Sequence, residues 1–137
     1  MHLNDSSMFF NGDFVNQAAE LRDRTRNFAV RVIKMTDGLP RRMSTEILAK
    51  QLVRCATSAG ANYRAACRAR SHAEFVSKMQ IVQEEADETQ YWLELLFRVG
   101  VLTEKEYLLL EREASELTAI FTASAATARK SKNSSSR

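Results

Sequence analysis

The stretch from Phe75 to Leu96 reads FVSKMQIVQEEADETQYWLELL, and its apolar positions alternate by four and three residues over three heptads. This spacing places successive side chains on one face of an α-helix. The acidic residues Glu84, Asp87 and Glu88 fall off the apolar stripe and toward water. The stretch therefore predicts one long amphipathic helix, whose packed face carries Phe75, Met79, Val82, Ala86, Thr89, Leu93 and Leu96.

Signals for helix ends divide the chain into four helices. Residues 71–74 and 103–106 have the Ser/Thr-x-x-Glu form of a capping box, which starts a helix. Gly38-Leu39-Pro40 is a stop signal, because glycine adopts the left-handed conformation after a helix and proline cannot continue one. Asp13 is a good N-cap for the first helix. We expect helices over about 13–37, 44–70, 71–98 and 103–128.

The fold expected from these helices is an all-α, antiparallel, up-down-up-down four-helix bundle. The loops are about two to six residues long, and loops this short make sequential helices neighbours. One proline and four glycines among 137 residues leave few breaks for a many-stranded fold. We expect the bundle over residues 13–128, a flexible N-terminus over 1–12 and a disordered basic, serine-rich tail over 129–137.

Apolar and small residues beyond the packed stripes indicate a homo-oligomer. Trp92 and Leu109 widen the apolar face beyond what one slim bundle needs, although a broad core within the chain is the alternative. Gly60 lies in mid-helix within the small-residue run ATSAGA of residues 56–61, and glycine there costs about 1 kcal/mol relative to alanine. A closely packed neighbouring helix would offset that cost. Asn62 either fixes register or oligomer state, as buried polar residues do, or turns toward the rim.

The sequence holds no recognisable catalytic or metal site. Its two histidines, His2 and His72, lack the Glu-x-x-His spacing of a di-metal bundle. Cys55 and Cys67 are separated by about 18 Å along one expected helix, so we expect free thiols. There is no glycine-rich phosphate loop and no nucleophile elbow. We expect a protein that is not an enzyme and that requires no cofactor or metal.

The location expected for this protein is the cytoplasm. No apolar run reaches the roughly 18 residues that cross a bilayer. The first residues, MHLNDSSMFFNGDF, lack the basic and apolar regions of a secretory signal.

Charge is unevenly distributed, although the net charge is only +3. Residues 41–70 hold seven basic side chains and one acidic side chain, whereas residues 71–98 hold two basic and six acidic ones. Arginine dominates the basic part, and its planar fork suits phosphate, so RNA or DNA is the leading partner class. The candidate phosphate contacts are Arg41, Arg42, Lys50, Arg54, Arg64, Arg68 and Arg70. The preceding helix is also basic and extends the expected basic surface, through Arg22, Arg24, Arg26, Arg31 and Lys34.

In the alternative interpretation, these charges balance the acidic helices within one bundle or between copies of it. Antiparallel packing of the second and third helices sets Arg54 near Asp87 and Glu88, where an exposed ion pair contributes about 0–1 kcal/mol. The protein would then be an interaction scaffold without affinity for nucleic acid.

Two stretches resemble a known family, namely QLVRCATSAGANYRAA at residues 51–66 and SHAEFVSKMQIVQEEADETQYWLELL at residues 71–96. Their specific parts are Gln51-Leu52-x-Arg54, Ser58-x-x-Ala61-Asn62 and Glu84-x-x-x-Glu88-x-x-x-Trp92-Leu93. From about residue 26 to residue 128 the chain resembles the four-helix-bundle proteins of intervening sequences within 23S ribosomal RNA genes. That family usually has Ile where Ala59 stands and often Glu where Ala65 stands.

This resemblance implies an antiparallel bundle that assembles as a ring, a pentamer, without known catalytic activity. A related branch, the accessory proteins of diversity-generating retroelements, is similar in architecture and associates with nucleic acid and a reverse transcriptase. We therefore expect a non-enzymatic homo-oligomer that binds RNA or DNA through its first two helices. A reverse transcriptase or another protein is a further expected partner.

Overall fold

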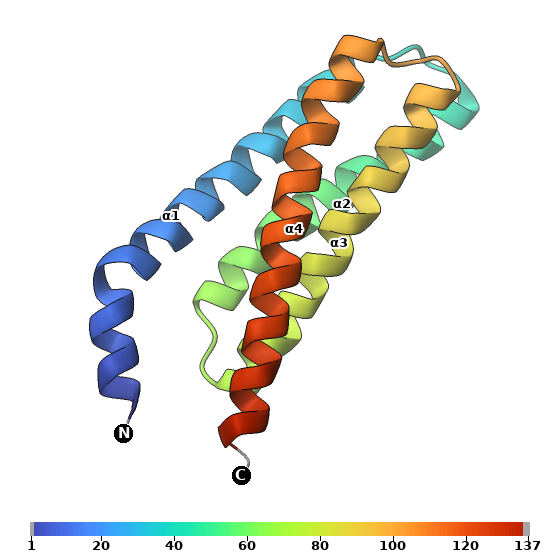
Figure 1. The fold of residues 1–137 in the computed structure, drawn as a ribbon. Coiled ribbons are helices and arrows are strands. Elements are labelled where there is room, and N and C mark those ends of the chain that lie inside the picture. The colour runs from blue at the N-terminus through green and yellow to red at the C-terminus, as the bar shows by residue number, and fades with distance from the viewer. Residues whose placement is uncertain (1, 136–137) are drawn as a thin grey trace.

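The computed structural model describes residues 2–135 and, within them, the side chains of residues 15–131. Four α-helices make up the chain: α1 (His2–Asp37), α2 (Met43–Cys67), α3 (His72–Arg98) and α4 (Glu104–Ser135). No strand occurs in the described range, so the prediction of an all-α protein is confirmed. The start of α1 and the end of α4 lie at one end of the molecule, and the loops 38–42 and 99–103 lie at the other (Figure 1).

Both predicted N-caps form, and the one at Thr103 is a complete capping box. The Ser71 hydroxyl accepts a hydrogen bond from the backbone N–H of Glu74 at 3.1 Å. The Thr103 hydroxyl accepts from the backbone N–H of Glu106 at 3.1 Å, and the Glu106 carboxylate accepts in return from the Thr103 N–H at 3.4 Å. Beyond the end of α3, Gly100 has a φ of +84°, a left-handed conformation that glycine adopts without steric cost. These local contacts fix where α3 and α4 begin and where α3 ends.

The outer ends of the bundle differ from the predicted ends. Helix α1 begins at His2 rather than near Asp13, because residues 2–12 contain no proline and one glycine, and nothing there stops a helix. Helix α4 continues to Ser135 rather than ending near Ala128. Helix α2 ends at Cys67, where tighter turns replace the helical pattern. The flexibility expected for residues 1–12 and 129–137 stays a prediction.

The core lies between all four helices, and the apolar stripe of α3 runs along its centre. Helix α3 contacts α2 and α4 along most of its length, whereas α1 packs chiefly on α2 and meets α4 at fewer positions. The stripe predicted on α3 is buried at six of its seven positions; Phe75 is half-buried, and its neighbour Val76 is buried instead. Facing residues of α4 are Leu110, Ala114, Leu117 and Phe121, all of them buried.

Of the two positions expected for Asn62, the structure is closer to the rim, and the neighbouring Tyr63 is buried in the core instead. The Tyr63 ring packs against Phe121 of α4 with their centroids 5.0 Å apart. The Asn62 amide is half-buried and donates within its own helix, to the Ser58 carbonyl at 2.9 Å and the Ser58 hydroxyl at 3.0 Å.

Helix α1 packs on the bundle through one buried face. Its Ala18, Phe28 and Val32 are buried, whereas Ile33 is 39% exposed. A bidentate ion pair links this helix to α4: Arg24 donates to both carboxylate oxygens of Glu113, at 2.6 and 3.0 Å. The hydrogen bond from Arg24 to Glu113 raises the pKa of the guanidinium. Within the described chain, no helix is long and apolar enough to cross a membrane.

Candidate nucleic-acid interface

Four arginines line an open groove between α1 and α2, which we call the arginine groove. Arg22 and Arg26 stand one turn apart on α1. Arg64 lies in the last turn of α2, and Arg68 is the C-cap residue that follows this helix. The guanidinium groups of both pairs line the same space. The hollow between them has a volume of about 390 Å³. Arg26, Arg64 and Arg68 are exposed, and Arg22 is half-buried.

Close packing of α1 on α2 forms the floor of this groove. A Cβ atom added at Gly60 would lie 3.5 Å from the Cβ and Oγ1 atoms of Thr25, so the two backbones approach closely there. Thr25 is 3% exposed, and its hydroxyl donates to the Arg22 carbonyl at 3.0 Å. The small-residue run of α2 therefore receives α1 of the same chain. This contact brings the arginine pairs of the two helices opposite each other.

Most of the charge in the arginine groove is not neutralised by the protein. Across the described side chains, no carboxylate oxygen lies within 4.0 Å of a guanidinium nitrogen of Arg22, Arg64 or Arg68. Arg26 pairs with Asp23 on its own helix at 3.0 Å, but both side chains are more than 60% exposed, and such a pair contributes little. The groove is thus a site where a polyanion would gain favourable contacts without displacing a strong ion pair.

Arg54, another candidate phosphate contact, instead belongs to an ion-pair network on the α2–α3 face. Its guanidinium lies 3.1 Å from a carboxylate oxygen of Glu85 and 2.8 Å from one of Glu88. The predicted proximity of Arg54 to Glu88 is confirmed, but the predicted proximity to Asp87 is wrong. Asp87 is exposed, and Glu85 pairs with Arg54 instead, because residues 85 and 88 lie on the helix face that meets α2. The hydrogen bond to Glu88 raises the pKa of Arg54. Desolvation alone would raise the pKa of Glu88, but hydrogen bonds led by those from Arg54 and Trp92 lower it.

This network also contains the three side chains whose spacing would suit a metal ion. The ligand atoms of Cys55, Glu85 and Glu88 lie within 4.8 Å of one another. The Arg54 guanidinium already supplies the positive charge among them and donates to Cys55 Sγ at 3.1 Å. Burial raises the pKa of the Cys55 thiol to about 12, so it stays protonated at neutral pH, whereas metals bind the thiolate. These residues therefore fit an ion-pair network better than a metal site.

The structure brings together only part of the predicted contact set. Arg70 joins Arg64 and Arg68 around an adjoining hollow of about 490 Å³. Arg41 and Arg42 stand before the first turn of α2, about 30 Å along the helix from Arg64. Exposed Lys50 lies two turns into α2, away from the arginine groove.

The binding set predicted from the sequence omitted Arg22 and Arg26. Both residues were assigned to a basic first helix. The pattern of apolar residues in that helix does not show which of its faces meets α2. The available signal was the matched spacing: pairs of arginines four residues apart occur once on each of the two helices, near the small-residue run.

The residues predicted to set oligomer contacts or register have different environments. Gly60 faces Thr25 of the same chain, and Asn62 bonds within α2. Trp92 is half-buried against the core, and its indole N–H donates to Glu88 at 3.1 Å. Leu109 is 54% exposed. Of the four, Leu109 is the one that presents apolar surface outward.

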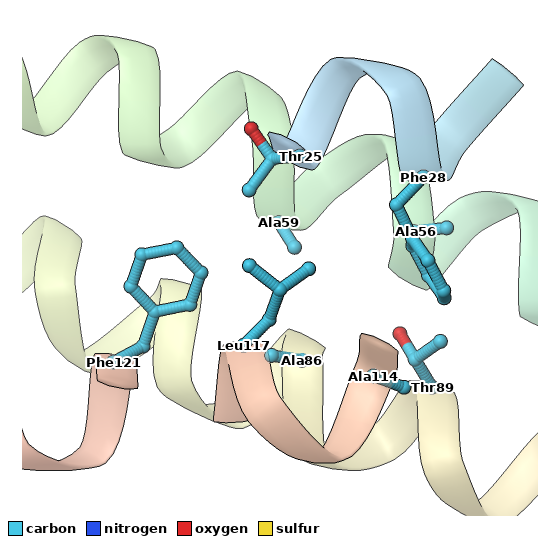
Figure 2. A pocket seen from close by; sticks show the side chains of 9 residues that line it. All are labelled: Thr25, Phe28, Ala56, Ala59, Ala86, Thr89, Ala114, Leu117 and Phe121. Carbon is cyan, nitrogen blue, oxygen red and sulfur yellow. The ribbon is translucent and has the colours of Figure 1, made fainter. Parts of the chain in front are cut away.

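The core cavity enclosed by described side chains of all four helices is too small for a ligand. Figure 2 shows the side chains around a cavity between the four helices, bounded by aliphatic and aromatic groups and the hydroxyls of Thr25 and Thr89. Its volume is about 10 Å³. A single water molecule needs about that much space, so this cavity is a packing defect of the core and not a substrate site.

Comparison with known proteins agrees with the fold. A family model described as 23S rRNA-intervening sequence protein matches residues 17–123. A crystal structure of a protein with unknown function from the S23 ribosomal protein family of Bacteroides thetaiotaomicron is similar, with 33% sequence identity and a TM-score of 0.73. The similarity covers 79% of this chain and 96% of that one. None of the curated proteins matches this sequence.

Proposed function

This chain belongs to the family of 23S rRNA-intervening sequence proteins, and from that premise we propose that it is a non-enzymatic, oligomeric protein that binds nucleic acid. The binding surface in this proposal is the arginine groove. The bundle is up-down-up-down and antiparallel, which the short loops and the pairing of Arg54 with both Glu85 and Glu88 support.

One observation carries the proposal: the arginine groove concentrates four guanidinium groups and leaves three of them without a carboxylate partner among the described residues. Guanidinium groups donate two parallel hydrogen bonds to phosphate and hold their charge at any physiological pH. Contacts of this kind position a nucleic-acid backbone and carry little sequence information. We therefore expect binding that depends strongly on salt and weakly on sequence.

The proposal covers both RNA and DNA, because phosphate contacts of this kind do not distinguish the two. The location proposed is the cytoplasm, and the two free thiols Cys55 and Cys67 support it, since reduced cysteines persist in reducing compartments.

Lack of a catalytic role is also part of the proposal. His72, the histidine within the described side chains, contacts the backbone carbonyl oxygen of Ala128 through Nε2 at 2.9 Å and so links α3 to α4. This contact is a structural use of a residue type that enzymes use as a base.

Exposed apolar side chains support the oligomer, for which the resemblance implies a pentameric ring. Met43 is 80% exposed, and Ile47, Leu108 and Leu109 are each 54% exposed. The same observation favours a second candidate function, a scaffold that binds a protein such as a reverse transcriptase. In that case Leu109→Ser dissolves the assembly or abolishes partner binding, and nucleic acid does not bind.

The proposed function is tested by fluorescence anisotropy with labelled structured RNA and duplex DNA, and light scattering on the same sample gives the oligomer size. One variant carries Arg64→Glu with Arg68→Glu in the arginine groove. Its matched control carries Arg41→Glu with Arg42→Glu, an equal charge change at the start of α2, where acids suit the helix dipole.

We expect the groove variant to lose binding while the control keeps it, and both to keep the wild-type oligomer. Absence of binding by the wild-type protein at low salt, or equal loss in the two variants, would overturn the arginine groove as the interface.

A further inference from the structure

The arginine groove continues into an apolar hollow toward the α2–α3 turn. This second hollow has a volume of about 290 Å³ and is walled mainly by small and aromatic side chains, including Ala18, Ala66, Ala69 and Phe75. Arg22 and Cys67 line both hollows, so the charged and the apolar hollow adjoin, and we call the two together the cleft.

We infer that this cleft holds one unpaired nucleotide of a nucleic-acid strand, with the phosphate on the arginines and the base in the apolar part. The inference rests on the proposed function and specifies its substrate class. Phosphates match the unpaired positive charge of Arg64 and Arg68. The flat, apolar faces of a base match the Phe75 ring and the alanine walls.

The shape of the cleft distinguishes an unpaired nucleotide from a duplex. In a paired helix the flat faces of the bases are stacked on one another, and a protein surface meets sugars, phosphates and base edges. Such a backbone would use the arginines and leave the apolar hollow empty. An unpaired base can turn away from its strand and enter a recess beside the phosphate site, as in most sequence-selective recognition of RNA. The charged hollow has a volume typical of small-ligand sites, and the apolar hollow adds further space beside it.

Cys67 provides a direct probe of occupancy. Its thiol is exposed in the wall shared by the two hollows, whereas Cys55, the other cysteine, is fully buried. Alkylation of the native full-length protein therefore reports on the cleft. Its rate is measured with a fully paired RNA hairpin, with the same hairpin carrying one bulged nucleotide, and with a free nucleoside monophosphate.

We expect the bulged hairpin to bind about tenfold more tightly than the paired one, as base stacking on an aromatic ring implies, and to slow alkylation of Cys67. Cys67→Leu fills the shared wall and should abolish this preference, while the nearly isosteric Cys67→Ser should keep it. Equal affinity for both hairpins without protection of Cys67 would overturn the inference and leave the proposed function intact. Protection by the free monophosphate alone would overturn the assignment to a strand. No binding of either hairpin would overturn both proposals.

Discussion

Replacing Arg54 by alanine should destabilise the protein without weakening its binding to nucleic acid. Arg54 and Arg64 are both exposed arginines of α2, but Arg54 is held by two carboxylates of α3, whereas Arg64 points into the arginine groove. The two residues therefore separate the structural use of arginine from the binding use proposed here.

The expected loss of stability follows from the burial of the partners. Arg54 is 48% exposed, but Glu85 is 14% exposed, so removing the guanidinium leaves a largely covered carboxylate without its counter-ion. Exposed ion pairs contribute about 0–1 kcal/mol and buried charged hydrogen bonds about 1.5–3 kcal/mol. We expect an intermediate loss of about 1–2 kcal/mol, which lowers the Tm of a chain of this length by roughly 3–7 °C.

Thermal and urea unfolding followed by circular dichroism measures this loss. All proteins are compared at one concentration, because the stability of an oligomer depends on it. Arg64→Ala is the matched control and should change the free energy of unfolding by less than about 0.5 kcal/mol. Unchanged stability in Arg54→Ala, or a loss of RNA affinity equal to that of Arg64→Ala, would contradict the division between the two arginines.

Three further substitutions test the packing and the pH dependence. Gly60→Ala should stabilise the protein by up to about 1 kcal/mol in urea unfolding, because a Cβ there meets Thr25 at an ordinary 3.5 Å; a loss would mean that α1 lies closer than described. Phe121→Ala should cost about 3–5 kcal/mol, since the ring is fully buried in the core, and a loss below about 1 kcal/mol would be inconsistent with that position. The lowered pKa of Glu88 adds stability that is present above its ordinary value of 4.5 and lost as the pH falls through the lower folded-state value. In Glu88→Gln, the free energy of unfolding should therefore fall less steeply as the pH is lowered through this range. An unchanged pH dependence would show that the ion pair of Glu88 does not contribute to it.

The features that could be predicted from the sequence depend on contacts within one or two helical turns. Capping at Ser71 and Thr103 joins residues three apart, and the apolar stripe of α3 repeats along a single helix. Both were correctly predicted. The match of Arg54 to Glu88 was also predicted, because antiparallel register across a short loop fixes which residues lie level.

The features that were missed depend on how a helix is rotated against its neighbour. The arginine groove forms because Thr25 packs on Gly60, a contact between residues far apart in sequence. A rotation of less than half a turn would point Arg22 and Arg26 elsewhere. A small rotation of α2 likewise decides whether Asn62 or Tyr63 faces the core.

The salt dependence of RNA affinity is the measurement to make first. Each phosphate that an arginine neutralises lowers the slope of log K against log salt by about 0.7 on a single strand. Four groove arginines give a slope of roughly −2.8, or about a 50-fold loss of affinity between about 50 and 200 mM salt. With Arg64→Ala and Arg68→Ala together, the slope should become shallower by about 1.4. A slope near zero in the wild-type protein, or an unchanged slope in this variant, would contradict binding through the arginine groove.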